Sequence, residues 1–297
     1  MHAVVQRVEA VLILVPDGWP SDRPLAVSVN VMLEGWAEGS APSIGPMGNP
    51  LKPGVRDFQA LSWAEYGPKT GMHHLLPALE QQQVRAVVYT SGVVAERYPD
   101  LLRRIVDQGH AVAAHGWSQG TLPAYLSPKD EAADIASCVD VLTRTTGQRP
   151  QGWLSPRCTP SADTSRLLAR AGFRWHADTF DTDLPYRLDT TSGSLLAMPF
   201  TMEVNDMPLY VRYGNEPEAF TRTLARITAG WERLGRPFAC LDITVHAHVF
   251  GRPYGVIALL DALELVRAQP WCWLTDHASL AELYNAPVGG RGVNPRG

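Results

Sequence analysis

The sequence predicts an α/β fold built on a mainly parallel sheet. Short runs of small and apolar residues alternate with amphipathic stretches six or seven times along the chain. Continuous apolar runs such as 86–90 and 110–115 are typical of strands buried on both faces of a parallel sheet. A chain of 297 residues suits one α/β domain whose sheet is either open or closed into a barrel.

Turn and capping residues divide the chain into these elements. Apolar residues repeat at intervals of three and four in 68–83, which predicts a helix. Gly109 ends the helix of 92–108, while Ser127 and Pro128 begin another that ends at Gly147. We therefore predict strands at 25–31, 86–90, 110–115, 152–155, 173–176, 195–199, 238–245 and 271–274. The helices are predicted at 68–83, 92–108, 127–145, 164–171, 217–234, 256–268 and 279–284.

Composition excludes several functional classes. The net charge of −4 leaves no basic surface for nucleic acid, and no apolar run reaches the length of a membrane span. The absence of G-x-G-x-x-G after a strand argues against a dinucleotide enzyme. Four scattered cysteines and the lack of a signal-peptide pattern predict a cytoplasmic protein. We expect an N-terminal extension over 1–23, one catalytic domain over 24–285 and a disordered tail over 286–297.

Polar residues follow almost every predicted strand. Because the carboxyl ends of parallel strands meet at one edge of the sheet, these residues are candidates for one active site. Each alone has a structural alternative, such as a surface ion pair for an arginine or a turn for an aspartate. The residues are Asn30, Glu34, His115, Gln119, Arg157, Asp181, Asp183, Asn205, Asp206, His246 and His248.

These side chains are suited to hydrolysis of an amide or ureide. That reaction needs a base for the water, a group that holds the oxyanion and an acid for the leaving nitrogen. Glu34 is our candidate base and His246 our candidate acid, because imidazole titrates near neutral pH. Arg157 is a candidate for holding a carbonyl or a carboxylate. A metal is poorly supplied, since His115 is a good ligand but Gln119 is a weak neutral one.

Several short motifs, in order, resemble one family. The segment from His115 to Gln119, Arg157 in Gly-Trp-Leu-Ser-Pro-Arg and His246 after Asp-Ile-Thr-Val resemble the polysaccharide deacetylases (NodB homology). Five further short motifs look most like the branch of metal-independent allantoinases. They are the Gln-Gly-Trp of 151–153 and the segments 183–186, 199–201, 205–207 and 246–253. The resemblance covers 24–284. It implies a distorted (β/α)7-type barrel and hydrolysis of a carbon–nitrogen bond that is not a peptide bond.

The metal-binding pattern of the family is altered here. Metal-dependent members carry paired aspartates after the first strand and then His-x-x-x-His, whereas this chain has Asn30, Val31 and Met32, and Gln119 replaces the second histidine. The allantoinase-like branch usually has Arg-Trp at the position of Ser118 and Gln119. We therefore expect no cofactor or one weakly bound divalent metal, zinc if any, with His115 and Gln119 as its ligands.

The leading functional prediction is a hydrolase of a small amide, ureide or cyclic imide. The alternatives are an N-deacetylase of an acetylated amino sugar or polysaccharide, and a non-catalytic binding homologue. We expect Glu34, His115, Arg157, Asp183 and His246 to converge on one pocket, with Glu34, His246, Arg157 and Asp183 catalytic. The loop over 39–54 should lie over or beside this pocket as a lid. The expected partners are a small-molecule substrate and further copies of the chain. Predicted substrate contacts are Asn30, Trp36, Trp117, Trp153, Asn205, Asp206 and His248.

Overall fold

The structure is a computed structural model that describes residues 15–285 apart from 44, 49–50 and 53. Most of the expected extension over 1–23 and the whole expected tail over 286–297 lie outside the described residues. The described end of the extension packs on the domain. The Trp19 ring lies edge-on to Phe238 and Trp273, with ring centroids 5.9 and 5.6 Å away.

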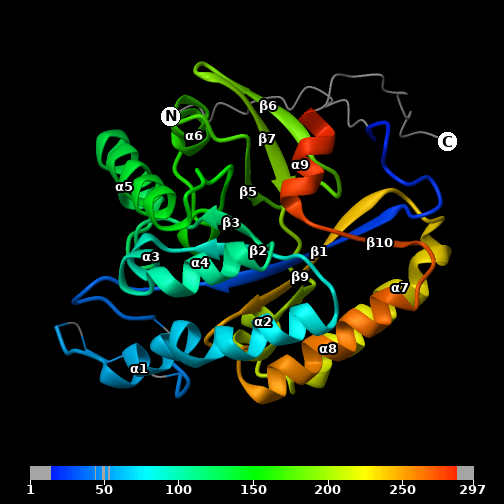
Figure 1. Cartoon of the computed structure of the whole chain (residues 1–297), viewed down its shortest axis with the longest axis horizontal. Coiled ribbons are helices and arrows are strands. Elements are labelled where there is room, and N and C mark those ends of the chain that lie inside the picture. The colour runs from blue at the N-terminus through cyan, green and yellow to red at the C-terminus, as the bar shows by residue number, and fades with distance from the viewer. Residues whose placement is uncertain (1–14, 44, 49–50, 53, 286–297) are drawn as a thin grey trace, which may run out of the picture.

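One sheet of ten strands forms the centre of the molecule (Figure 1). Its strand order is β6-β7-β5-β4-β3-β2-β1-β9-β8, and β10 pairs with β1 beside β9. All described pairings are parallel except that of β6 with β7. The strands are β1 (Leu25–Leu33), β2 (Val87–Thr90), β3 (Ala111–Ala114), β4 (Gly152–Trp153), β5 (Trp175–Thr179), β6 (Tyr186–Thr190), β7 (Gly193–Pro199), β8 (Val204–Asn205), β9 (Ala239–His246) and β10 (Cys272–Thr275).

Helices connect the strands, and most of them pack on the outer face of the sheet. Figure 1 shows α7 and α8 running side by side. The α-helices are α1 (Phe58–Tyr66), α2 (Met72–Gln81), α3 (Gly92–Arg97), α4 (Pro99–Asp107), α5 (Pro128–Thr146), α6 (Thr164–Arg170), α7 (Glu218–Gly230), α8 (Pro253–Arg267) and α9 (His277–Asn285). Shorter helical segments are η1 (Gly67–Gly71), η2 (Pro123–Tyr125), η3 (Pro156–Cys158), η4 (Met207–Arg212) and η5 (Trp231–Leu234).

The two faces of β1 show how the sheet is curled. Leu25, Val27, Val29, Val31 and Leu33 belong to the outer core under the helices. Ala26 and Met32 belong to a second core on the inner face, which Leu280 and Ala281 of α9 cover. Because side chains alternate along a strand, the same inner face also receives Ser28 and Asn30. The curled half-barrel therefore encloses a chamber that is partly polar.

The predicted single-domain α/β fold is confirmed. The sheet, in the strand order from β6 to β8, forms a curled half-barrel. The predicted helix over 92–108 is two helices, because Pro99 begins α4 after the non-helical Tyr98 (φ −129°). The sequence analysis also missed β6, the first strand of the β6–β7 hairpin, which alternates half-buried and exposed residues.

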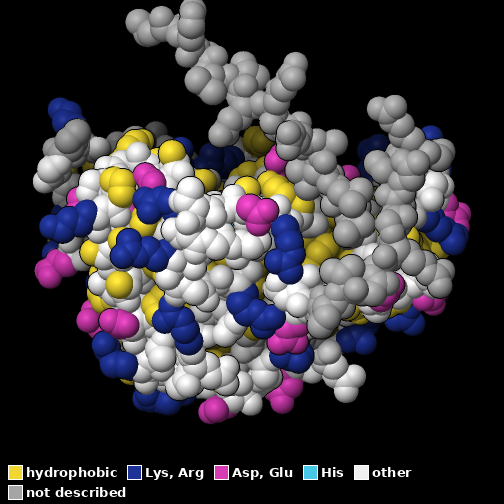
Figure 2. Space-filling model, turned by 90° about the horizontal axis from the view of Figure 1, so that it is seen from above, with side chains coloured by type: hydrophobic (Ala, Val, Ile, Leu, Met, Phe, Trp, Pro, Cys, Tyr) yellow, Lys and Arg dark blue, Asp and Glu magenta, His cyan; other side chains and the backbone are white. Residues whose placement is uncertain are grey.

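The described helices include no candidate for a membrane span. None of them combines the length and the hydropathy that a span requires. On the face shown in Figure 2, Lys and Arg side chains are interspersed with Asp and Glu.

Candidate active site

Glu34 lies at the centre of a cluster of three histidines at the carboxyl end of β1. Its Oε1 atom is 3.5 Å from Nε2 of His115 and 4.0 Å from Nε2 of His246, and its Oε2 atom is 3.9 Å from Nε2 of His248. The Glu34 side chain is only 10% exposed. The pairing of β1 with β9 brings Glu34 and His246 together, because it places Met32 beside His246. The predicted convergence of Glu34, His115 and His246 is therefore observed.

His246 is held by a buried aspartate. Its Nδ1 atom lies 2.6 Å from Oδ1 of Asp206, and its backbone N–H donates to Oδ2 at 2.7 Å. The backbone N–H of Phe250 also donates to Asp206, at 3.2 Å. A carboxylate accepts hydrogen bonds, so the proton is on Nδ1 and Nε2 is directed toward Glu34. Asp206 thus positions His246 rather than contacting a substrate, which corrects the role predicted for it.

His115 is fixed in a similar way, by a backbone carbonyl. Its Nδ1 atom donates to the oxygen of Leu154 at 2.7 Å, which leaves Nε2 facing Glu34. Gln119 is one turn away, and its amide nitrogen donates to Oγ of Ser91 and to the backbone oxygen of His115, both at 3.0 Å.

This donor set does not fit the divalent metal that the resemblance implies. Gln119 directs its amide nitrogen, which is a donor, into hydrogen bonds with the protein. A hydrolytic zinc site usually takes three ligands from imidazole, thiolate or carboxylate groups. The described residues contain no group of three or more His, Cys, Asp or Glu side chains arranged to hold a metal ion. We therefore derive no chemistry through a metal.

His248 differs from the other two histidines because neither ring nitrogen has a hydrogen-bond partner among the described residues. The ring is 1% exposed. Trp63 of α1 lies edge-on to it with ring centroids 4.5 Å apart, and Trp36 does the same at 5.9 Å. Buried polar groups normally have a partner, so His248 is a candidate for contact with a ligand, as is Trp36.

The protonation states of the cluster follow from its charges. Burial raises the pKa of Glu34, but the charges of His246, His248 and His115 and a hydrogen bond from His115 lower it further, to about 2. Burial lowers the pKa of His246, yet Asp206 and Glu34 raise it above the usual value. Burial lowers the pKa of His248 to about 4 despite the opposite effect of Glu34. At neutral pH the site therefore holds an ionised Glu34 beside a neutral His248.

Several predicted site residues lie outside this cluster. Arg157 follows β4 at the same edge of the sheet, but its side chain is exposed at the rim. Asp183 is also exposed, and its carbonyl accepts from the N–H of Cys240 near the start of β9, whereas His246 is at the far end of that strand. The structure therefore does not bring Asp183 to the pocket.

Three of the predicted substrate contacts, Trp117, Trp153 and Asn205, have structural positions instead. The Trp117 ring packs over Gly92 at the start of α3, and Trp153 is fully buried in the outer core, 5.7 Å from Phe173 between centroids. Asn205 caps a turn by accepting from Met207 N–H. Asn30 is fully buried in the chamber below Met32, and neither of its side-chain polar atoms has a hydrogen-bond partner among the described residues, so it stays a candidate for contact with a ligand.

A second Asp–His pair lies deeper in the chamber. Asp242 of β9 is 2.7 Å from Nε2 of His277, and Nδ1 of His277 is 2.7 Å from the hydroxyl of Tyr89. Asp242 also accepts from the N–H of Thr201 at 2.8 Å. All three members of this relay are fully buried. Sequence reasoning missed the relay because its members lie on three separate elements, β2, β9 and α9.

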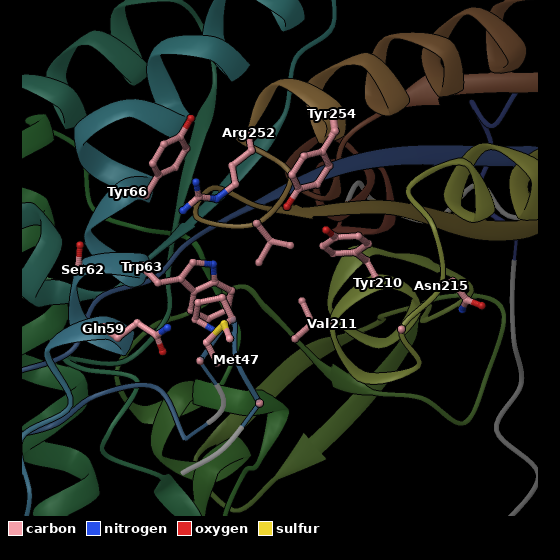
Figure 3. A pocket seen from close by; sticks show the side chains of 15 residues that line it. Met47, Gln59, Ser62, Trp63, Tyr66, Tyr210, Val211, Asn215, Arg252 and Tyr254 are labelled. Carbon is pink, nitrogen blue, oxygen red and sulfur yellow. The ribbon is translucent and has the colours of Figure 1, made fainter. Parts of the chain in front are cut away.

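A cavity of about 950 Å³ adjoins the cluster (Figure 3). Trp63, which contacts His248, lines it together with Val249, the next residue in the chain. Gly45, Pro46, Met47 and Gly48 form another part of its wall. The predicted loop over 39–54 therefore lies beside a pocket next to the site, although residues 44, 49–50 and 53 are outside the description.

Comparisons with known proteins concern the sequence and the fold of the chain. The family model described as polysaccharide deacetylase matches residues 60–176. A crystal structure of a probable polysaccharide deacetylase from Pseudomonas aeruginosa PAO1 is 26% identical, with a TM-score of 0.81 over 90% of this chain and 92% of that one. The chain is therefore similar, in sequence over 60–176 and in fold, to the polysaccharide deacetylase family. Members of this family are carbon–nitrogen hydrolases, which confirms the predicted enzyme class.

Other similar proteins carry names that point to different substrates. PuuE allantoinase is 25% identical, with a TM-score of 0.81 over 90% of this chain and 92% of that one. A putative polysaccharide deacetylase of Schizosaccharomyces pombe is 23% identical, over 90% of this chain and 92% of that protein. Peptidoglycan deacetylase of Helicobacter pylori is 25% identical over 56% of this chain, and the match spans about half, 55%, of that relative.

Proposed function

We propose that the chain hydrolyses a carbon–nitrogen bond of a small amide, ureide or cyclic imide. The enclosure of the cluster carries this proposal: Glu34 is 10% exposed, and His115, His246 and His248 are 2%, 9% and 1% exposed. A polymer chain needs an open groove along which several sugar rings lie, whereas small substrates are usually enclosed by their pockets. The structural similarity to PuuE allantoinase supports the same substrate class.

In the proposed reaction Glu34 accepts a proton from water while the water oxygen attacks the carbonyl carbon. The new C–O bond moves an electron pair to the carbonyl oxygen, which His115 stabilises through Nε2–H. For this role the His115 ring must carry a proton on both nitrogens, because its Nδ1–H already donates to Leu154. Collapse of this intermediate breaks the C–N bond, and His246 gives its Nε2 proton to the leaving nitrogen. Proton transfer from Glu34 to His246 then restores the site.

The charges of the site link the base to the acid. A carboxyl group with a pKa of about 2 is a weak base in the resting enzyme. The charge of His246 is the largest effect that lowers this pKa. When His246 donates its proton, the proton affinity of Glu34 rises, so donation to the leaving nitrogen and acceptance from water favour one another.

A pH profile tests these roles. We expect kcat to fall as pH rises through the raised pKa of His246, because the acid must be protonated. On the acidic side kcat should persist well below pH 5, because Glu34 stays ionised to about 2. An acidic limb near pH 4 would instead assign the base to His248, whose pKa is about 4. The substrate for this profile comes from a screen of ureides, cyclic imides and N-acetylated sugars, carried out on protein purified without added metal.

One observation favours a second candidate, an N-deacetylase of an amino sugar. Four aromatic residues, Trp63, Tyr66, Tyr210 and Tyr254, line the adjoining cavity, and aromatic faces commonly stack on sugar rings. The names of the curated relatives point the same way. Hydrolysis of N-acetylglucosamine oligomers, with no turnover of ureides or imides, would establish this alternative and overturn the leading proposal.

A further inference from the structure

The cavity beside the catalytic cluster has one positive side chain in its wall. Its described lining contains Arg252 and no acidic residue. Figure 3 shows the Arg252 side chain between Tyr66 and Tyr254. A half-enclosed pocket with a single cation and no carboxylate is suited to an anionic ligand.

Arg252 is held in place by an aromatic ring rather than by an acid. Its guanidinium carbon lies 3.9 Å from the centroid of the Tyr66 ring, which is a close cation–π contact. No ion pair forms between Arg252 and a described carboxylate within 4 Å. The stack orients the planar guanidinium and leaves its N–H donors without a charged partner. A planar guanidinium of this kind matches the two oxygens of a carboxylate.

The cavity adjoins the reaction centre through one shared side chain. The Trp63 ring contacts His248, and Val249 joins the cavity wall to the histidine cluster. The positive charge of Arg252 is felt by His248, where it contributes to the lowered pKa. A ligand anchored at Arg252 would therefore extend toward Glu34.

We propose that this cavity binds the carboxylate of the substrate, so that the preferred substrate is a ureide or amide that carries an acidic group. The proposal rests on the proposed function for the location of the scissile bond. Arg252 receives the carboxylate, and the neutral amides of Gln59 and Asn215, which also line the cavity, supply further donors. Trp63 and Tyr66 pack along the apolar part of the ligand. Arg252 is then a specificity-determining residue.

Equilibrium binding of two matched probes tests this proposal. N-carbamoyl-β-alanine carries a ureide and a carboxylate, and its primary amide has the same shape without the charge. Isothermal titration with the full chain should show at least tenfold tighter binding of the acid. Arg252→Gln should remove this preference, and Arg252→Lys should keep part of it, because lysine retains the charge without the planar fork. Circular dichroism and melting temperature should show that the variants are folded.

Arg222→Gln is the matched control, since Arg222 pairs with Glu216 on the exposed surface at 2.6 Å. It should leave the preference unchanged. Equal affinities of the two probes for the wild type, or a preference that survives Arg252→Gln, would overturn the proposal. Tighter binding of N-acetylglucosamine than of both probes would identify a sugar subsite and also overturn it. If the acid binds preferentially through Arg252 but no ureide is hydrolysed, the carboxylate site stands and the proposed reaction falls.

Discussion

Each of two Asp–His pairs has one member on β9. The pairs differ in what contacts the second nitrogen of the histidine ring. In the Asp206–His246 pair, Nδ1 is 2.6 Å from the aspartate and Nε2 faces Glu34. In the Asp242–His277 pair, Nε2 is 2.7 Å from the aspartate, but Nδ1 is occupied by the Tyr89 hydroxyl. An aspartate beside a histidine is therefore insufficient for acid–base chemistry, because the ring also needs a nitrogen that can reach a ligand.

The largest effect is expected when the histidine of each Asp–His pair is replaced by glutamine. His246→Gln should lower kcat by about 10²–10⁴-fold, because it removes the proton donor to the leaving nitrogen. A substrate with an activated leaving group should lose much less, since its departure needs no proton. His277→Gln should keep kcat and lower only the free energy of unfolding. Steady-state kinetics with both substrates measures this, and equal loss of kcat in the two variants would remove the distinction.

A second experiment removes the hydrogen-bond partner of Nδ1 in the Asp242–His277 pair. Tyr89→Phe leaves Nδ1 of His277 buried without a partner, so the free energy of unfolding should fall by about 1–3 kcal/mol. The value of kcat should stay within about twofold. Urea denaturation measures the first quantity, with the exposed Tyr125→Phe as the matched control. Loss of activity without loss of stability would show that the relay takes part in the reaction.

A smaller effect concerns His248 and the pH dependence of folding. The unfolded ring takes up a proton below about pH 6.5, but the folded ring does so only near 4. The unfolded state therefore binds more protons in this window, and stability falls as pH falls. Between pH 6 and pH 5 the wild type should lose about 1 kcal/mol more than His248→Gln. The exposed His73→Gln should follow the wild type in the same urea titrations.

The smallest effect is expected at Arg157, which the sequence placed in the site. Its side chain is exposed at the rim, so Arg157→Gln should change the free energy of unfolding by less than about 0.5 kcal/mol. The KM of the substrate should change less than in Arg252→Gln. If Arg157→Gln raised KM more, the carboxylate would be bound at the rim and the cavity would lose its assigned role.

The sequence was sufficient for the parts of the site that follow a strand directly. Glu34, His115 and His246 end β1, β3 and β9, and parallel pairing brings such ends together without further information.

Other parts depend on long-range packing that no local pattern records. Trp63 lies on a helix that the sequence analysis missed, and its role is set by contact with a histidine 185 positions later. Asp183 was expected at a strand end, but the β6–β7 hairpin directs that segment to the start of β9. Arg252 lies in the motif 246–253, but no local pattern shows that it stacks on Tyr66, which belongs to a distant segment.

The contact between Gly71 and Gly251 has a consequence for the history of this family. A Cβ at Gly251 would lie 2.6 Å from the Cα of Gly71 and 2.0 Å from the oxygen of Ala247, and one at Gly71 would lie 1.9 Å from that same oxygen. The two segments that carry Tyr66 and Arg252 therefore meet backbone to backbone. A lineage that gained a side chain at either glycine would separate the arginine from its ring. The two glycines and the Tyr66–Arg252 stack should accordingly be inherited as a unit, a four-position fingerprint by which chains with the same substrate preference can be recognised among similar sequences.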